Sequence, residues 1–253
     1  MLRLGLGNSF KLSEELDRVE MRCVGILADA HGNGPAFNRS VSVLKELGAE
    51  SFRFLGDAIG YIPSFSVLDS LRQLGSDVHC IRGNHEQMLL SDHIVESRDA
   101  VYQLTLLKAA INSEYLGLMA EWGLTLNEKL AGQSALFVHG SPEDPTAGYV
   151  YPNSDLSTFQ PDADIVFMGH SHRPFIRECN GVQYVNVGSC GLPRDDGRFG
   201  SAALFNPETC EIRVVRFDIT KETEAALAAF PSVHHSVRSV LARRSEKIYG
   251  DIL

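Results

Sequence analysis

Polar residues that can bind a metal ion or move a proton recur at five places in the chain, each directly after a short apolar run. They are Asp29 and His31, Asp57, Asn84 and His85, His139, and His170 and His172. Taken singly, each has an ordinary explanation, because Gly-Asp and Gly-Asn are common turn residues and Asp often caps a helix. Their recurrence at five run ends instead favours one shared site.

The donor types indicate which ions this site would take. Carboxylates, imidazoles and an amide, with no thiolate among them, suit Mn, Fe, Zn or Ni better than Ca, or Mg alone. The candidates outnumber the four ligands of a structural zinc site, so we expect two divalent transition-metal ions that share one carboxylate. The metal candidates are Asp29, His31, Asp57, Asn84, His139, His170 and His172.

The spacing within two of the motifs supports convergence on a small volume. Residues two apart in an extended segment point the same way, so Asp29 and His31 should approach each other. The same holds for His170 and His172. In both pairs the residue between the two is small.

The elements that must position these residues alternate between strand and helix in the first half of the chain. Short apolar runs predict buried strands at residues 22–28, 51–55 and 77–81. Helical periodicity follows each strand, at residues 35–47, 65–74 and from Gln87 onward. This repeat predicts parallel strands joined by right-handed crossovers, with loops gathered at the carboxyl edge where open α/β sheets bind ligands.

The second half predicts a long helix and a second sheet. Apolar residues at three- and four-residue steps over residues 100–122 predict one amphipathic helix. Shorter runs predict strands at residues 134–138, 165–168, 175–178 and 182–187. Asn180-Gly181 favours a hairpin between the last two. Another hairpin is predicted from residues 201–205 and 211–217. Two C-terminal helices are predicted at residues 222–229 and 232–249. We therefore expect an α/β fold with two facing mixed sheets flanked by helices.

Composition limits the classes of partner. The formal charge is −9, from 23 Lys and Arg against 32 Asp and Glu, with no basic cluster before Arg243-Arg244. We therefore expect no nucleic-acid-binding patch. Five widely spaced cysteines without a Cys-x-x-Cys pattern fit a reducing cytoplasm better than a disulfide framework. No apolar run approaches the length of a membrane span, so no membrane partner is expected.

No linker-like stretch divides the chain, so residues 21–253 are expected to form one domain that ends in helices. Residues 1–20 lack the continuous apolar core of a signal peptide. They are expected to be a flexible extension or an overcalled start, and the sequence leaves both explanations open.

In order, the five motifs resemble those of the calcineurin-like metallophosphoesterases. They read Asp29-x-His31, Gly56-Asp57, Gly83-Asn84-His85-Glu86, His139-Gly140 and Gly169-His170-x-His172. The resemblance spans residues 23–217 and implies the four-layer sandwich of that family. Further segments are most similar to the small bacterial and archaeal predicted phosphodiesterases: residues 31–33, Gly60-Tyr61, Asn186-Val187-Gly188-Ser189 and Pro193-Arg194.

The resemblance assigns the candidate ligands to two ions. One ion would be held by Asp29, His31 and His172, and the other by Asn84, His139 and His170. Asp57 would bridge the two. Such a pair of cations can lower the pKa of a shared water and clamp phosphoryl oxygens during in-line displacement.

Three further residues are candidates for catalysis and substrate binding. The resemblance implies that His85 faces the substrate without binding metal, where it would stabilise transition-state charge or protonate the leaving oxygen. Arg82 could make a charge-assisted contact to phosphate, and Asn33 is a second candidate for substrate binding.

These roles predict a phosphodiesterase or phosphatase that acts on a small phosphorylated metabolite or nucleotide. The stretch Arg82-Gly83-Asn84-His85-Glu86 is similar to the protein-phosphatase version of its motif, so a Ser/Thr protein phosphatase stays open. The residues after Asp57, Ala58-Ile59-Gly60, depart from the Asp-Arg-Gly continuation of those phosphatases and weaken that possibility. A dinucleoside polyphosphate hydrolase and a non-catalytic interaction scaffold on the same fold also stay open.

Overall fold

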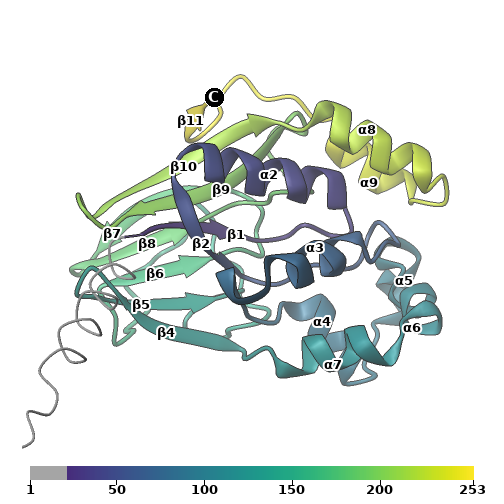
Figure 1. The fold of residues 1–253 in the computed structure, drawn as a ribbon, viewed down its shortest axis with the longest axis horizontal. Coiled ribbons are helices and arrows are strands. Elements are labelled where there is room, and N and C mark those ends of the chain that lie inside the picture. Colours follow the sequence, from purple (N-terminus) through teal and green to yellow (C-terminus); the bar gives the residue numbers. More distant parts are fainter. Residues whose placement is uncertain (1–21) are drawn as a thin grey trace, which may run out of the picture.

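The computed structural model describes residues 22–253, and the extension expected over residues 1–20 lies outside this range. Two mixed β-sheets face each other, and helices lie along the outer side of one of them (Figure 1). The expected α/β fold with two facing sheets is therefore confirmed.

The first sheet has the strand order β11-β10-β9-β1-β2-β3. Its strands are β1 (Cys23–Leu27), β2 (Ala49–Phe54), β3 (Val78–Cys80), β9 (Phe199–Asn206), β10 (Glu211–Asp218) and β11 (Asp251–Ile252). β1, β2 and β3 are parallel, as the strand-loop-helix repeat predicts. β9 and β10 form the expected antiparallel hairpin, and β9 lies beside β1.

The second sheet has the strand order β4-β5-β6-β8-β7. Its strands are β4 (Thr125–Leu130), β5 (Gln133–Val138), β6 (Ile165–Met168), β7 (Phe175–Cys179) and β8 (Val182–Asn186). β5, β6 and β8 are parallel, and β7 and β8 form a hairpin in which Asn180 (φ 53°) and Gly181 (φ 79°) are left-handed, as Asn-Gly predicts. β4 was not predicted, and it pairs with β5 across a turn at Ala131.

The main core lies between the sheets and on the outer side of the first. Val24 and Ile26 of β1 pack toward the second sheet, where the rings of Phe137 and Phe167 stack with centroids 4.9 Å apart. The alternate residue Leu27 packs under the helices. β1 is thus buried on both faces, which explains why it reads as a continuous apolar run.

Different structures cover the outer faces of the two sheets. The first sheet is covered by α2 (Gly34–Glu46) and α3 (Ser66–Leu74), while α8 (Thr220–Ala229) packs on α2 and α9 (His235–Leu241) packs beside α8 (Figure 1). The second sheet is covered by residues 140–164, which contain no helix or strand and place Val150 and Leu156 against Val166. A 3₁₀ turn (Gly75–Asp77) and α4 (Asn84–Leu90) flank β3.

The single long helix predicted over residues 100–122 is wrong. Three short helices replace it: α5 (Glu96–Tyr102), α6 (Leu104–Ala110) and α7 (Ser113–Glu121). Gln103 interrupts the helix between α5 and α6 because its φ of 56° is left-handed. At the second junction the Asn112 side chain accepts a hydrogen bond from the Tyr115 N–H and caps α7. The apolar residues still recur at helical spacing because α6 and α7 bury their apolar faces in the same core cluster.

The C-terminal helix predicted over residues 232–249 is also too long, because α9 ends at Leu241. Beyond it, the Ser245 N–H donates to the Asp196 carboxylate at 2.9 Å, and the Arg243 carbonyl accepts from the Gly197 N–H at 3.0 Å. These bonds hold the chain against the loop after β8 and direct it into β11.

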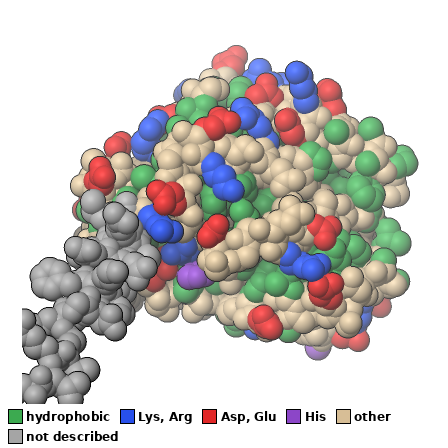
Figure 2. All heavy atoms as spheres, in the orientation of Figure 1, with side chains coloured by type: hydrophobic (Ala, Val, Ile, Leu, Met, Phe, Trp, Pro, Cys, Tyr) green, Lys and Arg blue, Asp and Glu red, His purple; other side chains and the backbone are tan. Residues whose placement is uncertain are grey.

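No helix among residues 22–253 is long and apolar enough to cross a membrane. Figure 2 shows Lys and Arg side chains mixed with Asp and Glu on the face that carries α2 and α3. Neither sign of charge dominates that face.

A buried ion pair fixes the loop after β8 to β10. Arg216 is fully buried and donates to both carboxylate oxygens of Asp195, at 2.6 Å and 3.0 Å. It also donates to the carbonyls of Phe199, Gly200 and Tyr249. The pair therefore joins three separate segments of the chain.

Arg216→Met should lower the free energy of unfolding by about 3–5 kcal/mol, because it leaves the Asp195 carboxylate without its partner. Urea unfolding measures the change. The matched control is Arg213→Met on the same strand, whose pair with Asp251 is exposed and contributes about 1 kcal/mol or less. Equal losses in the two variants would contradict the importance of the buried pair.

Candidate metal centre

The candidate residues meet where the parallel strands of both sheets end. Loops after β1, β2 and β3 of the first sheet face loops after β5, β6 and β8 of the second. The pocket between them is lined by His31, Asp57, Tyr61, Asn84, His85, Tyr102, Tyr149, His170, His172 and Arg194. All seven metal candidates lie at or beside it, although they are up to 143 residues apart in the sequence.

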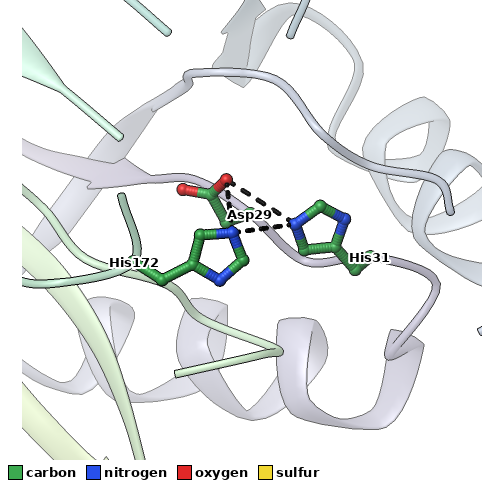
Figure 3. A group of neighbouring side chains, drawn as sticks. All are labelled: Asp29, His31 and His172. Carbon is green, nitrogen blue, oxygen red and sulfur yellow. Dashed lines mark hydrogen bonds and ion pairs between the residues drawn. The ribbon is translucent and has the colours of Figure 1, made fainter. Parts of the chain in front are cut away.

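One group of donor atoms comes from the loops after β1 and β6. Figure 3 shows Asp29, His31 and His172 pointing toward one another. The Nε2 atoms of the two histidines are 3.1 Å apart. Asp29 Oδ1 lies 3.3 Å from His172 Nε2 and 3.7 Å from His31 Nε2.

A second group lies around His139 at the end of β5. His139 Nε2 is 3.0 Å from His170 Nδ1, 3.2 Å from Asn84 Oδ1 and 3.4 Å from Asp57 Oδ2. The same Asp57 oxygen lies 3.7 Å from His31 Nε2 in the first group. Asp57 is therefore the carboxylate that the two groups have in common.

Backbone carbonyls fix the ring nitrogens that face the centre. His31 Nδ1 donates to the Ile59 carbonyl, His139 Nδ1 to that of Leu55, and His172 Nδ1 to that of Leu192. In the neutral rings each Nε2 is then a lone pair turned inward. Two such lone pairs 3.1 Å apart, as in His31 and His172, repel unless a cation or proton lies beside them.

The donor set fits a metal cation. Metal–ligand bonds of about 2.0–2.2 Å place neighbouring donor atoms about 3.0–3.5 Å apart, which matches the shorter separations in both groups. Asp29 Oδ1 is buried without a hydrogen-bond partner among residues 22–253. Buried acceptors of this kind are costly unless a cation satisfies them.

Charge around Asp57 supports the same conclusion. Burial opposes ionisation, but the neighbouring His139 and His85 hold the pKa of Asp57 well below its usual value. The Asp57 and Asp29 carboxylates in turn overcome burial and raise the pKa of His139 to about 9. Without a cation, the carboxylates thus draw a proton onto a residue whose Nε2 faces the centre.

The backbone brings these side chains together in a conformation that differs from the extended one that their spacing predicts. Asp29, His31, His170 and His172 all have φ between 50° and 61°, so neither motif is extended. Asp57 is left-handed too, with φ 59°. Such residues cost about 1–3 kcal/mol each and persist where surrounding contacts hold them, which is typical of functional sites.

Sequence comparison agrees with this geometry. A profile of the calcineurin-like phosphoesterase superfamily domain matches residues 21–209. The chain belongs to that superfamily. Its membership confirms the expectation of a hydrolase that acts on phosphoric esters.

The phosphoesterase is similar to proteins from archaea and from a bacterium. It is 27% identical over 225 residues to the uncharacterized protein MJ0912 of Methanocaldococcus jannaschii, covering 79% of this chain and 90% of that one. The fold matches a metallophosphoesterase from Sphaerobacter thermophilus (TM-score 0.72, 20% identity, 87% of this chain and 98% of that one). It also matches the hypothetical protein PH1004 from Pyrococcus horikoshii OT3 (TM-score 0.75, 20% identity, the same coverage of both chains).

His85 of this phosphoesterase lies in the pocket beside both ligand groups. Its Nε2 is 3.9 Å from Asp57 Oδ2, and its ring packs against those of Tyr61 and Tyr102. A Cβ on Gly60 would come within 2.0 Å of His85 Nδ1, so glycine is required there. Burial lowers the pKa of His85 to about 3. The ring is therefore neutral near pH 7.

The two predicted substrate contacts do not line the pocket. Asn33 is fully buried, caps α2 through the Ala36 N–H, and donates to the Gly191 carbonyl and the Thr223 hydroxyl. Arg82 donates to the Gln87 side chain at 3.3 Å. Their roles toward substrate stay predictions, and the contacts of Asn33 are those of a structural residue.

Glu86 has a positioning role that the motif alone did not reveal. Its buried carboxylate accepts from the backbone N–H groups of Asp57, Ala58 and Gly83 at 2.8–2.9 Å. It therefore ties the loop that carries Asp57 to the loop that carries Asn84. The sequence signal was only its place in the motif, since its partners Asp57 and Ala58 lie 29 and 28 residues away.

Pocket tyrosines and an arginine were also missed as site residues. Tyr61, Tyr102, Tyr149 and Arg194 enter from four different segments. Arg194 and Tyr149 come from loops without regular structure, where sequence periodicity carries no information on side-chain direction.

Glu86→Gln should lower activity about 10- to 100-fold, the usual effect of losing a group that orients metal ligands. The amide NH₂ that replaces one oxygen would face backbone N–H groups and could not accept from them. Steady-state kinetics and metal titration measure the loss. The control Glu178→Gln makes the same change at an exposed position of β7, and an equal effect there would contradict the role of Glu86.

Proposed function

We propose that this phosphoesterase is a phosphodiesterase or phosphatase with a dinuclear metal centre, acting on a small phosphorylated metabolite or nucleotide. The observation that carries the proposal is the position of Asp57 between two separate groups of donor atoms. Its Oδ2 lies 3.4 Å from His139 Nε2 on one side and 3.7 Å from His31 Nε2 on the other. One carboxylate so placed can serve two cations.

The ligand assignment follows from the two groups. Asp29, His31 and His172 would hold one divalent transition-metal ion. The second ion would be held by Asn84, His139 and His170, and both ions would share Asp57. Mn, Fe, Zn and Ni all suit this donor set, and manganese is the first to test. When bound, such ions supply a water of lowered pKa and a clamp for the phosphoryl oxygens.

His85 acts on the substrate as a hydrogen-bond donor in this proposal. Its ring lines the pocket with Nε2 3.9 Å from Asp57 Oδ2, while Nδ1 is buried against Gly60 without a hydrogen-bond partner among the described residues. Because its pKa is lowered to about 3, a neutral imidazole that donates to developing oxygen charge fits better than an imidazolium that transfers a proton. The Asp57 carboxyl accepts from the backbone N–H of His85 at 3.0 Å, which fixes the residue relative to the ligands.

The same proposal includes one domain over residues 21–253 and a cytoplasmic location. Pairing of β11 with β10 and packing of α8 on α2 support grouping the C-terminal segments with the N-terminal half. All five cysteines are free, which suits a reducing compartment.

The direct test is an activity panel on metal-stripped protein reconstituted with Mn, Fe, Zn, Ni or Mg. The substrates are phosphodiesters, phosphomonoesters, a phosphopeptide and a dinucleoside polyphosphate. Turnover of a small ester with a transition metal supports the proposal. Exclusive turnover of the phosphopeptide would replace it with a protein phosphatase, and no turnover with any metal would favour a non-catalytic scaffold.

Asp57→Asn and His85→Ala should separate metal binding from catalysis. Asp57→Asn removes the shared charge, so we expect loss of activity and weaker retention of both ions. His85→Ala should keep its metal content while turnover falls about 10²- to 10⁴-fold. Metal analysis beside steady-state kinetics measures both effects, and an Asp57→Asn variant with normal turnover would refute the dinuclear centre.

Metal affinity should rise with pH between about 6 and 8. The metal-free protein binds a proton on His139, whose pKa is raised to about 9, and a cation must displace it. Below that pKa, each unit of rising pH should therefore tighten binding by up to about tenfold per proton released. Titration with Mn²⁺ at several pH values measures the slope, and a pH-independent affinity would show that no such proton competes.

A further inference from the structure

Arg194 is the one cationic side chain among those that line the described pocket. It follows β8, and its backbone N–H lies 3.5 Å from the carbonyl of the ligand candidate His172. Its guanidinium donates to the Tyr61 hydroxyl at 3.1 Å, a neutral partner. Among residues 22–253, no carboxylate lies within 4 Å of it, so its charge is not paired within the described chain.

The carboxylates that follow Arg194 in the sequence are engaged elsewhere. Asp195 accepts from Arg216 on β10, and Asp196 accepts from Arg198 at 2.8 Å. The loop thus contains two acidic residues directly after Arg194, and both turn away from it. This arrangement leaves the guanidinium available to an anion in the pocket.

The two buried arginines of the described chain, Arg53 and Arg216, are paired, unlike the half-buried Arg194. Arg53 is 8% exposed and donates to both oxygens of Glu128 at 2.7 Å and 2.9 Å. Arg216 is 0% exposed and does the same with Asp195. A guanidinium matches carboxylate and phosphate oxygens with the same fork of donors, so an unpaired one beside a phosphoesterase centre fits a phosphoryl group.

We propose that Arg194, held by the Tyr61 hydroxyl, binds the non-bridging oxygens of the substrate's phosphoryl group. It is the specificity-determining cation of this site, in the place that the sequence suggested for Arg82. The inference rests on the proposed function for its substrate, but the binding of an oxyanion by Arg194 can be tested without turnover.

Inorganic phosphate is the probe, titrated calorimetrically into protein reconstituted with Mn²⁺. Arg194→Met should weaken phosphate binding about 10- to 100-fold, the effect of one charge-assisted hydrogen-bond pair. Arg194→Lys keeps the charge but loses the paired N–H donors of the guanidinium, so its phosphate affinity should lie between those of wild type and Arg194→Met. The control Arg243→Met removes an exposed cation that contacts the Arg194 carbonyl from outside the pocket, and it should bind phosphate within about twofold of wild type.

Thermal unfolding distinguishes this role from a structural one. Because no ion pair of Arg194 is broken, Arg194→Met should keep the wild-type Tm or raise it, whereas Arg216→Met should lose about 6–20 °C. Phosphate should raise the Tm of wild type and not that of Arg194→Met. On the small phosphoester, kcat/KM should fall about 10- to 100-fold in Arg194→Met and only about two- to fivefold in Tyr61→Phe.

Three results would overturn the assignment: unchanged phosphate binding in Arg194→Met, an equal loss in Arg243→Met, or a loss of Tm in Arg194→Met as large as in Arg216→Met. Failure of the proposed function gives a different pattern. Wild type would then bind phosphate through Arg194 but hydrolyse no ester. This result would support the oxyanion site and refute the proposed hydrolysis of a small phosphoester.

Discussion

The repulsion between donor atoms at the centre is the constraint on which the rest of this structure depends. His31 and His172 turn lone pairs toward each other at 3.1 Å, with the Asp29 carboxylate beside them. Left to themselves, these groups would separate or take up protons, since the Asp57 and Asp29 carboxylates raise the pKa of the nearby His139 to about 9. The surrounding chain holds them through ring-to-carbonyl hydrogen bonds and left-handed residues that are costly in isolation. A site that opposes its own assembly in this way is stabilised by what it binds.

Two sheets contribute because one set of parallel strand ends could not surround the proposed pair of ions. β1, β2 and β3 bring the carboxylates, Asn84 and His31, whereas β5 and β6 bring the remaining histidines. Each trio of parallel strands ends at the same place, and the apolar layer between the sheets fixes the distance between the trios. Packing of Phe137 and Phe167 against Val24 and Ile26 of β1 therefore bears on the separation of donor atoms that none of these residues touches. The Glu86 carboxylate adds a local tie between two loops of the first trio.

Much of this could be predicted from the sequence because it depends on local patterns. Strands buried on both faces read as apolar runs, and Asn180-Gly181 specifies a hairpin turn. Ligand types at strand ends revealed the site. The three short helices were missed because Gln103 has no local feature that demands a left-handed conformation, and the apolar periodicity continues past it. Arg194 and Glu86 were missed for another reason: their roles are defined by partners far away in the sequence, which no spacing rule contains.

The charge of the chain explains why an unpaired arginine matters here. A protein of formal charge −9 has no general attraction for an anionic ester, and screening limits any such field to about 8 Å at physiological salt. Attraction must therefore come from inside the pocket. Cations bound at the proposed centre would first offset Asp29 and Asp57, whereas Arg194 has no carboxylate partner among the described residues. The loop after β8 leaves Arg194 unpaired because its Asp195 pairs with Arg216 and its Asp196 pairs with Arg198. Because Arg216 and Arg198 neutralise Asp195 and Asp196, the charge of Arg194 stays free at the site.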